Sequence, residues 1–175
     1  MIKTTPGQIS LFEEDCQAAL QTKKSIWRLL VDGASRGNPG KAGIGIVIEH
    51  NRQVVEEHGF FIGHHKTNNE AEYTALIVGL YYVRLRMQPG DYLEIRTDSE
   101  LLVKQCLRVY KVRKPELVVL HAVVGKLLEP LSYDIAHLLR KHTAKADELA
   151  NRGVDKKKTL PLKVLDTLSR YGFEL

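Results

Sequence analysis

Four acidic residues stand at positions that could bring them together around a metal ion. Asp32 follows an apolar run and precedes a turn rich in Gly, Ser, Asn and Pro. Glu72 lies early in an expected helix, Asp98 follows a later apolar run, and Asp147 begins another expected helix. Carboxylates that converge repel one another unless a cation is present. Their hard oxygen ligands suit Mg²⁺ or Mn²⁺.

The chemistry that such a group could perform is hydrolysis of a phosphodiester. Two divalent ions about 4 Å apart can activate a water and stabilise the leaving oxygen. Each acid taken alone has a simpler explanation, because carboxylates near a helix N-terminus or in a turn are favourable there anyway. We assign that simpler role to three neighbouring acids, of which the first is the main competitor of Glu72: Glu70, Glu100 and Glu148.

Alternating and helical patterns of apolar residues indicate the elements that must position these acids. Ile44, Ile46 and Ile48 alternate as in a strand, whereas the apolar positions between 71 and 83 have helical spacing. We expect Asn68 or Asn69 to cap that helix. The expected strands cover about 27–32, 43–50, 53–62, 92–96 and 132–138, and the expected helices about 69–86, 98–106, 115–128 and 143–153.

This order of elements, β-β-β-α-β-α-α-β-α, indicates an α/β protein with a mixed sheet. If the first and fourth strands lie side by side, Asp32 and Asp98 become neighbours at the same edge. The helix acids, Glu72 and Asp147, could then close over them from either side.

Four segments that contain the acids resemble, in order and spacing, the successive motifs of type 1 ribonuclease H. They are Asp32–Gly40, Thr67–Glu72, Thr97–Ser99 and Ala146–Asn151, and the resemblance covers about residues 27–153. One such motif would be weak evidence, but four in order are specific. In that family the second acid comes three residues after the second of two asparagines, which selects Glu72 over Glu70.

The resemblance implies a fold, an activity and a cofactor. The fold would be a five-stranded mixed sheet, its first three strands antiparallel, flanked by helices. The activity would be endonucleolytic cleavage of the RNA strand of RNA–DNA hybrids, with two Mg²⁺ ions (or Mn²⁺) bound together with the substrate. The metal ligands would be Asp32, Glu72, Asp98 and Asp147. Two alternatives stay open: a hybrid-binding module that has lost catalysis, and a nuclease for DNA on the same fold.

The resemblance also implies where the hybrid is held. Asn38, Asn68 and Asn69 match family positions that contact the hybrid near the cut, where a 2′-hydroxyl identifies RNA. Helix capping is the simpler role for Asn68 and Asn69, and the two roles are compatible. Ser35 and Ser99 are further candidates for contact with the nucleic-acid backbone.

Two features depart from many family members. The first is the stretch 107–115, which is short, so the chain resembles the branch that lacks a basic protrusion. Lys104, Lys111 and Arg113 could still line the DNA strand, or form a solvated basic surface.

The second concerns a histidine that many members carry well upstream of the last Asp. Here His142 lies only five residues before Asp147. By residue type it could be a general acid or proton shuttle, and an exposed bystander is the alternative.

Composition bounds the setting in which the protein works. The chain has 175 residues and a net charge of +5, which suits one domain and is compatible with nucleic-acid contact. It has no apolar run of about 18 residues and no signal-peptide pattern. The two cysteines have no metal-ligand spacing, which suits a reducing compartment. We therefore expect a cytoplasmic protein without a membrane segment, and a monomer.

The domain organisation that we expect has three parts. Residues 1–25 would be a flexible N-terminal tail, 26–154 the ribonuclease H domain, and 155–175 a basic, amphipathic C-terminal tail.

Within the N-terminal tail, Gln8–Phe12 is similar to the peptide by which many bacterial replication and repair proteins bind the sliding clamp. Gln8 would be the polar lead residue and Leu11 and Phe12 the apolar anchors. A chance match of five residues is the alternative.

Overall fold

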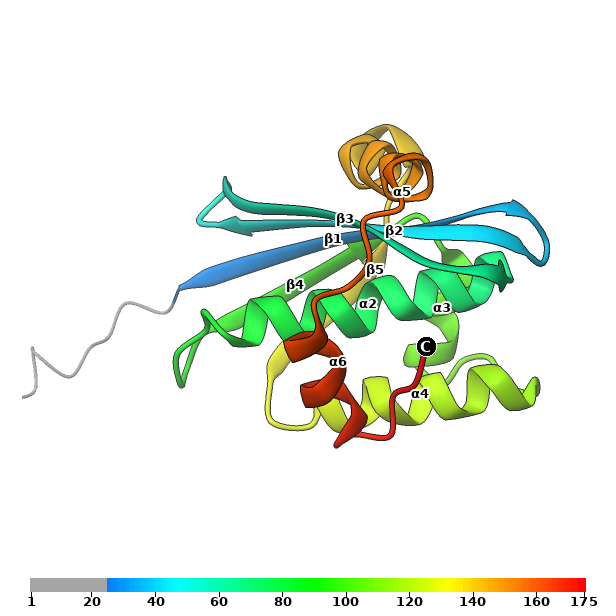
Figure 1. Ribbon diagram of the computed structural model, residues 1–175. Helices are drawn as coiled ribbons and strands as arrows, with labels where there is room; N and C mark the ends of the chain where they lie inside the picture. Colours follow the sequence, from blue (N-terminus) through cyan, green and yellow to red (C-terminus); the bar gives the residue numbers. More distant parts are fainter. Residues whose placement is uncertain (1–24) are drawn as a thin grey trace, which may run out of the picture.

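The computed structural model describes residues 25–175 and contains one five-stranded sheet with helices on both faces (Figure 1). In chain order the elements are β1 (Ile26–Gly37), β2 (Gly40–His50), β3 (Gln53–Lys66), α2 (Asn68–Arg84), β4 (Tyr92–Thr97), α3 (Glu100–Cys106), α4 (Pro115–Leu128), β5 (Ser132–His137), the 3-10 turn η1 (Arg140–His142), α5 (Ala144–Lys156) and α6 (Leu162–Ser169).

The sheet has the strand order β3-β2-β1-β4-β5. β1 pairs antiparallel with β2, and β2 with β3, whereas β4 runs parallel to β1 and β5 parallel to β4. The prediction of a mixed sheet with three antiparallel strands is therefore confirmed, as is the expectation that the first and fourth strands are neighbours. Their register pairs Leu30 with Arg96, so Asp32, which lies within β1, and Asp98, which follows the last residue of β4, stand at the same level of the sheet.

Successive residues of β1 point to opposite faces and thereby build two cores. Leu29 and Val31 belong to the large core that contains α2, while Leu30 packs with Val47 of β2 under α5. Figure 1 shows α5 alone on one side of the sheet and α2, α4 and α6 on the other. The part of the sheet that carries Asp32, with Asp98 beside it, therefore has helices on both sides.

Glycines allow α5 to lie directly on the sheet. A Cβ on Gly45 would come within 1.8 Å of the Ala146 carbonyl oxygen, and one on Gly43 within 2.5 Å of the Ala150 oxygen. Real side chains cannot occupy such space, so these two positions on β2 require the absence of a Cβ. This close approach sets the distance between α5 and the sheet. It thereby also sets the position of Asp147, which lies in the first turn of α5.

Two expectations about where elements begin and end differ from the structure. β1 does not end near residue 32 but continues to Gly37, because residues 33–37 stay paired with β2. The N-cap of α2 is Thr67, not Asn68 or Asn69: its hydroxyl accepts from the Glu70 N–H, and the Glu70 side chain accepts from the Thr67 N–H in return. This capping box satisfies two backbone donors that a side-chain amide at the next position cannot reach.

Within residues 25–175, no helix is long and apolar enough to cross a membrane.

The C-terminal segment passes from one face of the sheet to the other. We predicted a tail from residue 155, but α5 continues to Lys156. The Phe61 N–H of β3 then donates to the Lys158 oxygen at 2.7 Å, and α6 follows on the α2 side (Figure 1). Val164, Leu168 and Phe173 belong to the large core. The amphipathic pattern that suggested a tail is thus a packed helix face.

Candidate active site

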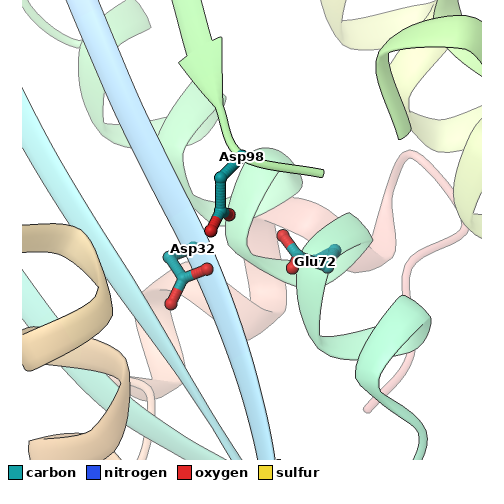
Figure 2. A group of neighbouring side chains, drawn as sticks. All are labelled: Asp32, Glu72 and Asp98. Carbon is teal, nitrogen blue, oxygen red and sulfur yellow. The ribbon is translucent and has the colours of Figure 1, made fainter. Parts of the chain in front are cut away.

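Asp32, Glu72 and Asp98 form a compact acidic trio, in which one oxygen of each lies within 4.8 Å of the others. Figure 2 shows their side chains pointing toward one another from within β1, from α2 and from just beyond β4. Asp32 and Glu72 are each 5% exposed. The sequence-predicted convergence of these three acids is therefore a feature of the structure.

Local geometry explains why Glu72, and not Glu70, joins the trio. A Cβ on Gly33 would lie 2.3 Å from the backbone nitrogen of Glu72, so α2 can touch β1 only because residue 33 is glycine. Glu70 is turned toward the capping box, where its carboxylate accepts from the N–H and the hydroxyl of Thr67, both at 2.8 Å. These hydrogen bonds outweigh burial and lower the pKa of Glu70.

The trio is electrostatically costly without a cation. Burial, followed by the charges of Asp98 and Asp147, raises the pKa of Asp32 to about 8. Burial, with the charges of Asp32 and Asp98, also raises the pKa of Glu72 well above its ordinary value. Its Oε2 atom is buried and has no hydrogen-bond partner among residues 25–175. A buried oxygen without a partner beside two other carboxylates fits a divalent cation held by oxygen ligands.

Asp147 reaches the same pocket from the opposite face but lies outside the trio. The pocket has a volume of about 270 Å³, and Asp147 lines it together with the three acids. Asp147 Oδ1 accepts from Arg140 Nη2 at 2.5 Å and from Asn151 Nδ2 at 3.3 Å. The structure therefore brings the fourth acid to the rim of the site, where it is paired with an arginine.

Sequence reasoning missed Arg140 and Asn151, both of which line the pocket. Asn151 is four residues after Asp147, one turn along the same helix, so helical spacing could have found it. No comparable signal marks Arg140, because its place depends on the direction of the short η1 turn.

Three of the predicted substrate residues gather at the rim of this pocket. Ser35 and Asn68 line it. Asn38 Oδ1 accepts from the Asn68 N–H at 3.1 Å, and the Ser35 hydroxyl donates to the Lys66 oxygen at 2.8 Å. The turn between β1 and β2 is thereby tied to the start of α2, where Asn69 follows.

The other predicted residues do not line the pocket as residues 25–175 define it. Ser99 is the N-cap of α3, and Lys104 pairs with Glu100 at 2.7 Å. Lys111 and Arg113 lie between α3 and α4 and are exposed. His142, on η1, is exposed as well. Gln8, Leu11 and Phe12 lie outside the described residues.

Comparison with known proteins places most of this chain within one family. A family described as reverse transcriptase-like matches residues 30–153. Ribonuclease HI of Halobacterium salinarum is 38% identical over 127 residues, which are 71% of this chain and 62% of that protein. The chain thus spans less than two thirds of that relative. Ribonuclease H of Coxiella burnetii is 32% identical over 148 residues, covering 76% of this chain and 92% of that protein.

Solved structures agree with the sequence relatives. RNase H1 from Halobacterium salinarum superposes with a TM-score of 0.70 at 35% identity, over 75% of this chain and 98% of that one. LC11-RNase H1, solved in complex with an RNA/DNA hybrid, gives a TM-score of 0.71 at 36% identity, over 74% of this chain and 97% of that one.

Proposed function

The chain belongs to the type 1 ribonuclease H family, and from this membership we infer that it is a hydrolase that cuts the RNA strand of RNA–DNA hybrids. The acidic trio carries the inference, because it offers three carboxylate oxygens within 4.8 Å of one another. A relative with the same fold has been solved with an RNA/DNA hybrid bound.

The residues present suit Mg²⁺, with Mn²⁺ as an alternative. Asp32, Glu72 and Asp98 would hold the ions directly, with Asp147 completing the set from α5. Two divalent ions bound there with substrate would supply an activated water and stabilise the leaving oxygen. The buried Asp32 and Glu72 carboxyls, costly to ionise without a cation, would ionise when the ions bind.

The rim of the pocket would hold the substrate. Asn38, Asn68 and Asn69 present amide groups near the start of α2, where the helix dipole favours an anion such as phosphate. Ser35 lies beside them. After Asp98 in the chain, the DNA strand would be followed by Ser99, Lys104, Lys111 and Arg113. The exposed His142 would serve as a general acid or proton shuttle.

One assay tests the activity and separates it from the alternatives. Labelled RNA–DNA hybrid, duplex DNA and duplex RNA are incubated with the full chain, with Mg²⁺ or with chelator. We expect Mg²⁺-dependent cutting of the RNA strand of the hybrid only. Binding of hybrid without cutting would indicate a catalytically inactive module, and cutting of duplex DNA would indicate a DNA nuclease.

Asp98→Asn supplies the matched control. We predict that this variant folds and loses cleavage, since charge rather than volume is needed to hold a cation. In chelator it should be as stable as the parent or more stable, because repulsion from Asp32 is relieved. Thermal unfolding checks the first point and the hybrid assay the second; a folded variant that cuts at the parent rate would remove Asp98 from the site.

Recruitment and location are proposed from the sequence alone. Gln8–Phe12, outside the described residues, would bind a bacterial sliding clamp in the cytoplasm through Leu11 and Phe12. A single short peptide should bind with micromolar affinity, on the order of −8 kcal/mol. Calorimetry against the host's clamp, with Leu11→Ala/Phe12→Ala as control, tests this; equal binding by the two proteins would make the pentapeptide a coincidence.

A further inference from the structure

Asp147 is already paired with a cation, the guanidinium of Arg140. Arg140 Nη2 lies 2.5 Å from Asp147 Oδ1, and the Arg140 side chain is 72% exposed while that of Asp147 is 27% exposed. Arg140 begins the three-residue turn η1, and its side chain lines the same pocket as the acidic trio. The cation therefore reaches the pocket from the solvent side on a short, exposed turn.

Arg140 acts on the whole group of acids and not on Asp147 alone. It is the sole positively charged residue among the described residues that line the pocket. Its charge counteracts the burial that raises the pKa of Asp32 and of Glu72. A fixed positive charge in this position stabilises the acids in the way a bound ion would, though more weakly.

We propose that Arg140 is a resident counter-cation that competes with the divalent ions for Asp147. The inference rests on the proposed function and deepens it, because it assigns a residue that sets the affinity of the metal site. The guanidinium occupies Asp147 Oδ1, and two cations on one carboxylate repel each other, so an ion that takes Asp147 as a ligand binds less well while Arg140 stays in place.

Displacement should be easy for this pair. An exposed ion pair stabilises only weakly, because both groups are well solvated when apart. The Arg140 side chain meets this condition, and η1 holds it by no side-chain hydrogen bond other than that to Asp147 among the contacts described. Arg140 would thus neutralise the site in metal-free protein and leave it when metal arrives.

The proposal predicts the sign of a metal-affinity change. Arg140→Ala should bind Mn²⁺ more tightly than the parent, by roughly two- to tenfold, since both the competitor and its repulsion are removed. If Arg140 instead served to position Asp147 for the metal, the same substitution would weaken binding. The two roles therefore give opposite results.

Two further variants separate competition from a change in net charge. Lys141→Ala removes the same charge from the next residue of the same turn, where the side chain is exposed and does not line the pocket. We expect parent-like affinity from it. Arg140→Lys keeps a cation at the site, so its affinity should also stay close to that of the parent.

The experiment is calorimetric titration of the full chain and the three variants with Mn²⁺, in the absence of nucleic acid. Thermal unfolding is the second readout, and the rise in unfolding temperature caused by Mn²⁺ should be larger for Arg140→Ala than for the parent. Equal or weaker binding by Arg140→Ala, or equal tightening by Lys141→Ala, overturns the proposal while leaving the proposed ribonuclease activity intact. Failure of the parent to bind Mn²⁺ at all overturns both.

Discussion

Glu70 and Glu72 lie two positions apart on α2 but have opposite surroundings. Their side chains diverge by about 200° around the helix, so only one can face the trio. We predict that Glu72→Gln loses cleavage without loss of stability. Glu70→Gln should keep cleavage and lose about 0.3–1 kcal/mol of stability, because glutamine can still accept from the Thr67 N–H but the negative charge near the start of α2 is lost. Hybrid cleavage and denaturant unfolding of both variants check this. Equal loss of activity would mean that the wrong acid has been assigned.

The raised pKa of Asp32 makes the stability of metal-free protein depend on pH. Its pKa is about 8 in the folded state against 3.8 ordinarily, so between these values the folded protein keeps a proton that the unfolded chain has released. The free energy of unfolding should therefore fall as pH rises from about 4 to 8, by an amount on the order of a few kcal/mol.

Denaturant unfolding at several pH values in chelator measures this dependence. The free energy of unfolding of Asp32→Asn should fall less steeply over the same range, with the remaining slope due to Glu72, whose pKa is also raised by burial, and the variant should be more stable than the parent at pH 8. Saturating Mg²⁺ should also flatten the parent's profile, because the bound ion favours the ionised carboxyl. A parent profile in chelator that matches Asp32→Asn would contradict the assigned shift.

At the scale of elements, we expect that the contact between α5 and the sheet leaves no space for an added methyl group. We predict that Gly45→Ala costs about 1–3 kcal/mol or more, since its Cβ would meet the Ala146 oxygen at 1.8 Å and push α5 away. Cleavage should fall as well, because α5 carries Asp147. Gly125→Ala in the exposed face of α4 is the matched control.

A Cβ at Gly125 meets nothing within 4 Å. That substitution should stabilise the protein by about 0.8–1 kcal/mol, because alanine favours the helix, and leave cleavage unchanged. Thermal unfolding and the hybrid assay distinguish the two variants. Loss of stability in both would show that backbone contact with the sheet does not explain the cost at Gly45.

For the whole molecule, the C-terminal segment ties the two faces of the sheet together. Leu168 is fully buried in the large core, whereas Leu162 on the same helix is 76% exposed. We predict that Leu168→Ala costs about 2–5 kcal/mol and that Leu162→Ala costs less than about 0.5 kcal/mol. Cleavage below the unfolding transition should persist in both, since α6 contributes no residue to the pocket. Similar, small losses of stability would mean that this segment is a dispensable tail.

Local sequence patterns determined much of this protein. The alternation of Ile44, Ile46 and Ile48 and the helical spacing before Arg84 are short-range features, so strands, helices and the mixed sheet could be predicted from them, although the first strand runs five residues past Asp32. The resemblance to a known family added the antiparallel arrangement of the first three strands and the choice of Glu72. The convergence of Asp32 and Asp98, which are 66 residues apart, was expected on the condition that the first and fourth strands lie side by side, as they do.

Only the tertiary structure decided what depends on how distant segments pack. The glycines of β2 set the distance between α5 and the sheet, and this distance leaves Asp147 at the rim of the pocket and outside the acidic trio. The direction of η1 brings Arg140 to that carboxylate, and the path of the chain across β3 turns an expected tail into a packed helix. The spacing of residues in the sequence does not predict these contacts. Each contact depends on side-chain volumes and backbone directions in several elements at once.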